Sequence, residues 1–137
     1  MALPKLETPT YTLTLPSTGE EVKYRPFLVK EQKRLLLAQD SKDEDEIIDA
    51  MSALIKDCTF DGVNPKLCSL FDAEYIFLRV RGKSVGDKAN VNVKCPDDKE
   101  TMTPVTIDLS EVEVHMTDDH TNEIQVTDTV KMILRYP

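Results

Sequence analysis

A change of hydrophobic period near the N-terminus constrains the fold more than any other feature of this sequence. Tyr11, Leu13 and Leu15 alternate with threonines, and the period of two resumes at Val22 and Tyr24. Between these runs, residues 16–19 (Pro-Ser-Thr-Gly) have the composition of a turn. Alternating apolar residues on both sides of a turn are typical of a β-hairpin. The sequence therefore predicts an antiparallel hairpin over residues 11–26.

The period then changes to that of an α-helix, which we expect to begin at Leu28. Its predicted inner face carries residues at helical spacing, and basic residues lie on the other face. The inner face is expected to contain Leu28, Gln32, Leu35, Leu36 and Gln39. Ser41 and Glu44 then have the spacing of a capping box, which predicts that the next helix begins there.

The second helix has the clearest apolar face of the chain, and the breakers Gly62 and Pro65 follow it. This face comprises Ile47, Ile48, Met51, Leu54, Ile55 and Cys58. Residues 71–82 are ambiguous, because their β-branched and aromatic side chains suit a strand. Asp72 as an N-cap and Gly82 near the end suit a helix instead. Of the two, we favour a buried helix.

The rest of the chain has the alternating pattern of β-strands. Residues 89–95 and 103–109 alternate on either side of a turn at 96–99, which predicts a second hairpin. A short strand is expected over residues 112–116, and a last pair over residues 124–126 and 130–136. The predicted fold class is α+β, with an N-terminal β-hairpin, two or three helices and a β-rich antiparallel second half. We expect one domain over residues 1–137, with hairpin and helices in 1–86 and the β-rich part in 87–137.

Charge and cysteine content narrow the possible partners and surroundings. The 137 residues carry a net charge of −8, which opposes a nucleic-acid partner because phosphate neutralisation needs a basic surface. The three cysteines do not form a disulfide framework, so we expect a reducing cytoplasm. No apolar run approaches the ~18 residues of a membrane span, and no partner membrane is expected.

The motifs that resemble chemical sites are each incomplete, so we predict no catalytic, cofactor-binding or metal-binding residues. Cys95 begins a turn like half of a zinc knuckle, but Asp98 stands where the second cysteine is needed. His115 and His120 lack the spacing that places two ligands on one helical face. The Gly-Lys-Ser at residues 82–84 lacks the earlier glycine of a phosphate loop, and we expect a helix end and turn there.

Two features favour binding to another protein. Arg79, Arg81, Lys83 and Lys88 form the densest basic group of an acidic chain, which suits docking of an acidic surface. The strand edges of the β-rich half are a second candidate contact, because open edges pair with other chains.

Three stretches of sequence resemble a known viral family. These are "MALPKL" with "LPSTGEEVKYRPFLVKEQKRLLLA", then "RGKSVGDKANVNVKCPDD" and "VTIDLSEVEV". They are similar to the N-terminal and middle regions of T4-like bacteriophage baseplate hub and hub-assembly proteins. The resemblance implies a non-enzymatic tail protein that contacts other hub and tail proteins in the virion baseplate, which is assembled in the host cytoplasm. It also implies that this chain is the N-terminal region of a longer protein.

An alternative function is a zinc-ribbon-like adaptor for nucleic acid or protein that has lost its metal ligands. The missing second cysteine and the acidic charge weigh against it.

Overall fold

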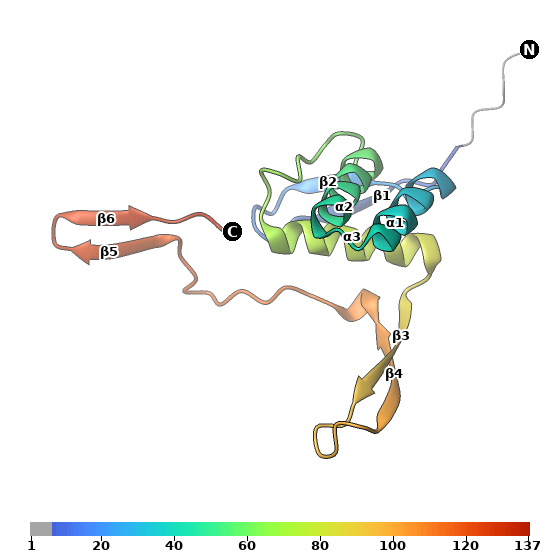
Figure 1. Ribbon diagram of the computed structural model, residues 1–137. Helices are drawn as coiled ribbons and strands as arrows, with labels where there is room; N and C mark the ends of the chain where they lie inside the picture. Colours follow the sequence, from blue (N-terminus) through green and yellow to red (C-terminus); the bar gives the residue numbers. More distant parts are fainter. Residues whose placement is uncertain (1–6) are drawn as a thin grey trace, which may run out of the picture.

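A computed structural model describes residues 7–137, so the "MALPKL" part of the resemblance lies outside the described residues. Residues 7–137 form three hairpins and three helices. The first hairpin and the helices make up a body, from which β3–β4 and β5–β6 project separately (Figure 1). The elements are β1 (Tyr11–Thr14), β2 (Glu21–Tyr24), α1 (Val29–Ser41), α2 (Glu44–Cys58), α3 (Leu70–Val85), β3 (Lys88–Lys94), β4 (Met102–Asp108), a 3-10 turn (Leu109–Glu111), β5 (Glu123–Thr127) and β6 (Val130–Ile133). The predicted α+β class is confirmed.

The predicted N-terminal hairpin is present. β1 and β2 pair antiparallel, with Tyr11 opposite Tyr24 and Leu13 opposite Val22. Gly19 closes the turn at a φ of 72°, a conformation that glycine adopts without steric cost. The alternation places Leu13, Val22 and Tyr24 inward, where they are buried.

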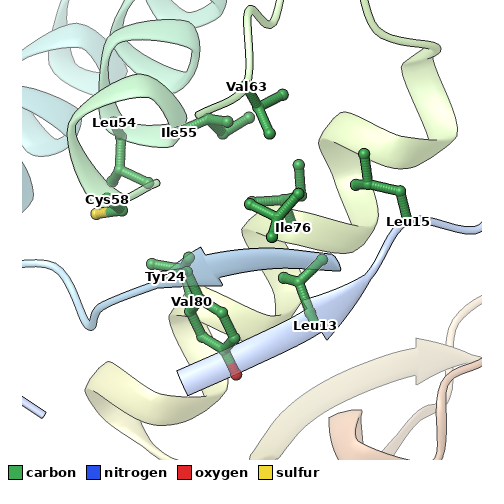
Figure 2. Close-up of a cluster of buried hydrophobic side chains, with 10 residues drawn as sticks. Leu13, Leu15, Tyr24, Leu54, Ile55, Cys58, Val63, Ile76 and Val80 are labelled. Carbon is green, nitrogen blue, oxygen red and sulfur yellow. The ribbon is translucent and has the colours of Figure 1, made fainter. Parts of the chain in front are cut away.

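The hairpin packs on α2 and α3 to form the core of the body. Figure 2 shows side chains from both strands meeting side chains from the two helices. Leu54, Ile55 and Cys58 come from α2, and Ile76 and Val80 from α3. The predicted apolar face of α2 is thus largely confirmed, although Ile48 on that face is exposed.

The predicted inner face of α1 is mostly wrong. Leu35 packs against the core as expected. Leu36 is 55% exposed, however, and the residues that are buried are Glu31 and Ala38, which the prediction did not include. The reason is an ion pair, because the Glu31 carboxylate lies 2.9 Å from the Arg25 guanidinium and accepts the backbone N–H of Leu28 at 2.8 Å. Satisfying this buried charge turns the Glu31 side of the helix toward the body.

The predicted capping box at Ser41 is also wrong. Ser41 is the last residue of α1, and its hydroxyl donates to the carbonyl of Ala38. The N-cap of α2 is Asp43, whose carboxylate accepts the backbone N–H groups of Asp45 and Glu46. Asp43 therefore satisfies the free donors of the first turn in place of Ser41.

Residues 70–85 form a helix, so the helical interpretation of residues 71–82 is confirmed. Ser69, and not the expected Asp72, is the N-cap. Gly82 lies inside the helix instead of at its end, and the helix continues through Lys83 and Ser84. The C-cap is Gly86, at a φ of 124° that strongly favours glycine.

The second half contains two of the predicted hairpins and lacks one predicted strand. β3 pairs with β4, and β5 pairs with β6, each as a separate two-stranded sheet. Residues 112–116, expected as a strand, are irregular and follow the 3-10 turn. Among the described residues, no helix is long and apolar enough to cross a membrane.

Candidate partner-binding surfaces

The β3–β4 hairpin has one apolar and one polar face. Val91 lies directly opposite Val105, and Ala89 lies opposite Ile107. Because side chains alternate along a strand, these residues share a face, and Asn90 and Asn92 lie on the other. Val91, Val93, Val105 and Ile107 are each 39–49% exposed. No other helix or strand among residues 7–137 covers this apolar face.

The β5–β6 hairpin repeats this design. Ile124 lies opposite Met132, and Val130 lies on the same face two residues from Met132. The other face carries Gln125 opposite Lys131, and Lys131 forms an ion pair with Glu123. Ile124 and Met132 are 47% and 48% exposed, so the apolar face is open to solvent within the described chain.

The hairpin-bearing half also carries most of the net negative charge. Residues 87–137 contain eleven acidic and five basic residues, which gives −6 of the total −8. Asp97, Asp98 and Glu100 lie in the connection between β3 and β4, while Asp118 and Asp119 precede β5. The apolar faces are therefore bordered by acidic segments.

Of the four predicted docking cations, Arg79 and Lys83 line one depression of the surface, and Arg81 lies on another face of α3. Arg79 is half-buried, its guanidinium donating to the carbonyls of Ser110 and Val112 at 3.0 Å each and lying 4.8 Å from the Tyr75 ring centre. Arg81 is also half-buried, and two residues along a helix it faces away from Arg79. Its Nη1 atom is buried, and the described residues offer it no hydrogen-bond partner.

The other two predicted cations, Lys83 and Lys88, are exposed. The Lys83 ammonium lies 5.5 Å from the centre of the Tyr11 ring, close enough for a cation–π interaction. Lys88 belongs to β3 and lies opposite Asp108. These two are the most exposed of the four predicted cations.

A buried carboxylate joins the first hairpin to α3. Asp72 is 1% exposed and accepts hydrogen bonds from the backbone N–H of Ser17 at 3.1 Å and from the Ser69 hydroxyl at 2.7 Å. The Ser17 hydroxyl donates to the same carboxylate. Three donors meet the charge, so Asp72 is a structural junction. From the sequence we expected Asp72 to be a helix cap. Its contact with Ser17 could not be predicted from local patterns, because Ser17 lies 55 positions away.

The C-terminal residues return to the body beside this junction. The backbone N–H of Leu70 donates to the carbonyl of Pro137 at 2.8 Å, and the Tyr136 ring packs edge-on against Phe71. His120 stacks on Tyr136 and hydrogen-bonds to its hydroxyl at 2.7 Å. An open depression of about 500 Å³ lies between this segment, the β1–β2 turn and the loop before α3.

Cys58 and Cys68 do not have the surroundings of a nucleophile. Burial raises the pKa of the Cys58 thiol to about 11, far from the value of a reactive thiolate. Burial also raises the pKa of Cys68. Beside Cys95, the Asp98 carboxylate accepts hydrogen bonds from the backbone of Glu100 and from Thr101, so it is engaged in the turn.

Metal-binding side chains are likewise scattered. Over residues 7–137, no three His, Cys, Asp or Glu side chains lie close enough together to hold a metal ion.

The most extensive feature that sequence analysis missed is the exposure of the two apolar hairpin faces. The alternation of residues predicted both apolar faces correctly. In each hairpin only two strands pair, with no third strand beside them, and this could have indicated that the apolar faces have no covering layer.

Comparison with known proteins shows a family for this chain. The model of the family described as T4 bacteriophage base plate protein matches residues 8–137. No curated protein and no solved structure has significant similarity to this chain.

Proposed function

Because this chain belongs to the T4 bacteriophage base plate protein family, we propose that it acts at the baseplate hub without catalysing a reaction. In this proposal it is a hub component or a hub assembly factor, and its function is to contact other hub and tail proteins. It would act in the virion tail baseplate, which is assembled in the host cytoplasm.

One observation carries the proposal: two hairpins project from the body with their apolar faces uncovered (Figure 1). A two-stranded hairpin is marginally stable alone in water and gains stability when another sheet or helix covers its apolar face. Large exposed apolar patches on a protein surface mark interaction sites. These features support a protein that functions by association.

The exposed cations support a second contact of the same kind. We propose that Lys83 and Lys88 meet an acidic surface of a tail protein. Arg79, which lines one depression with Lys83, and the half-buried Arg81 are proposed as further members of this contact.

A gene disruption tests the proposal. We expect infection with a phage lacking this gene to yield tails without complete baseplates in electron micrographs, with rescue by the gene supplied in trans. Mass spectrometry of purified tails then separates the two forms of the proposal, because a hub component stays in the particle and an assembly factor does not.

The same complementation assay tests the absence of catalysis. Cys95→Ala and His115→Ala should rescue as well as the wild-type gene. Normal baseplates without the gene would contradict the assembly role. Loss of rescue by either substitution in a folded protein would contradict a non-enzymatic role.

A further inference from the structure

We propose that the apolar faces of β3–β4 and β5–β6 dock on another baseplate protein, at a surface with an apolar centre and a basic rim. The inference rests on the proposed function and names the surface that performs it. The two faces are centred on the cross-strand pairs Val91–Val105 and Ile124–Met132.

The pattern of the hairpins indicates that each has one buried and one solvated face in the assembled state. In each hairpin one face holds apolar side chains at its centre, and the other face is mainly polar, although it also carries Met102 in β3–β4 and Ile133 in β5–β6. Antiparallel sheets with this alternation pack one face on a core and leave the other in water. The described chain supplies no core for either hairpin, so we assign the covering layer to a partner.

Charge identifies the chemistry of that partner. Residues 87–137 carry a net charge of −6, and the acidic segments Asp97–Glu100 and Asp118–Asp119 flank the two hairpins. Complementary potentials across an interface favour binding, and like charges brought together oppose it. A partner with lysines and arginines around an apolar centre satisfies both requirements.

The same charge opposes the other possible occupants. A second copy would bring −6 against −6 around the same faces. An anionic membrane surface attracts basic segments and repels acidic ones. The negative phosphates of nucleic acid would also be repelled by these acidic segments. A protein of opposite charge is therefore the occupant that the surface fits.

Substitutions that change the apolar faces and leave the body untouched test the proposal. In the test variant, Val91, Val105, Ile124 and Met132 are all replaced by threonine, which keeps a strong preference for strands. The control variant carries Asn92→Thr and Gln125→Thr on the polar faces of the same hairpins. Circular dichroism melting should show the same cooperative transition for both variants, because the exposed positions do not contribute to the core.

Binding is measured with each purified baseplate protein of the same phage, by biolayer interferometry. We expect one of them to bind the wild-type chain, and we expect the fourfold variant to lose roughly tenfold or more in affinity, since apolar area leaves the interface. The control variant should bind as the wild type does. Raising the salt concentration should weaken wild-type binding severalfold, because it screens the acidic and basic rims.

Several results would overturn the proposal. The first is equal affinity of the fourfold variant and the wild type for the baseplate protein. The second is a wild-type dimer in sedimentation that is absent in the fourfold variant. The third is binding of the wild type, but not of the variant, to vesicles of phosphatidylcholine and phosphatidylglycerol. If the fourfold variant also rescues baseplate assembly, the docking surface is wrong while the proposed function stands. If no baseplate protein binds the wild type and baseplates form without the gene, the proposed function has failed, and the docking surface with it.

Discussion

At the scale of single residues, two buried carboxylates hold the body together. Glu31 pairs with Arg25 and accepts the backbone N–H of Leu28, so it connects the end of β2 to the start of α1. Asp72 accepts hydrogen bonds from Ser17 and Ser69 and connects the β1–β2 turn to α3. A buried charge needs partners to offset its loss of hydration, and each carboxylate here has several.

We expect Asp72→Asn to lower the free energy of unfolding by about 1–3 kcal/mol, because the amide cannot accept all three hydrogen bonds. Chemical denaturation followed by circular dichroism measures the change. Glu74→Gln, at an exposed position of the same helix, is the matched control and should have little effect. An equal loss in both variants would contradict the role assigned to Asp72.

The Glu31 carboxyl makes a pH-dependent contribution to stability. Burial raises its pKa, but hydrogen bonds from Arg25 and the backbone, with the positive charge of Arg25, bring it below the ordinary 4.5. Because the folded pKa is lower than the unfolded one, this contribution is complete above pH 4.5 and is lost as the pH falls through the folded value. We expect the stability gap between wild type and Glu31→Gln to shrink over that acid range in denaturant titrations. A constant gap would refute this linkage.

At the scale of the elements, the chain contains two kinds of hairpin. β1–β2 packs its apolar face on α2 and α3 and is part of the core. β3–β4 and β5–β6 have equally apolar faces with no covering layer in the described chain. The difference lies in the surroundings of the strands and not in their pattern.

Hydrogen exchange monitored by mass spectrometry should distinguish the two kinds of hairpin. We expect backbone amides of β3–β4 and β5–β6 to exchange much faster than those of α2 and α3 in the isolated protein, because local opening of an uncovered hairpin costs little free energy. Exchange of the hairpins should slow when a docking partner is added. Slow exchange of both hairpins in the protein alone would show that they are stable without a cover.

At the scale of the whole molecule, charge and structure divide the chain in the same place. Residues 1–86 are nearly balanced at −2, and the part of them that is described folds around one core, whereas residues 87–137 carry −6 and two exposed hairpins. The 3-10 turn and the C-terminal residues tie the second part to α3, through Arg79 on one side and the N–H of Leu70 on the other. This division suits a protein whose body positions two contact surfaces for a partner.

The local pattern of residues was sufficient to predict most helices and strands of this protein. The first hairpin, the helical face of α2 and the two later hairpins were predicted from periodicity and turn residues. A helix was favoured over residues 71–82 from its capping residues, and α3 runs from Leu70 to Val85. Each of these depends on residues close together in the chain, and alternation or helical spacing reports it directly. The family was also recognisable from short stretches of sequence, and the match over residues 8–137 confirms it.

Only the tertiary structure decided which faces are covered. Leu36 was expected inside, but it is exposed, and the Arg25–Glu31 pair turns the Glu31 side of α1 inward. Asp72 was assigned to a cap, but Ser17 reaches it from a distant turn. Val91, Val105, Ile124 and Met132 form the apolar faces that alternation predicts, yet these faces remain exposed in the described chain. Periodicity shows that a face is apolar, but what packs against it depends on contacts between residues far apart in the sequence, or on another molecule.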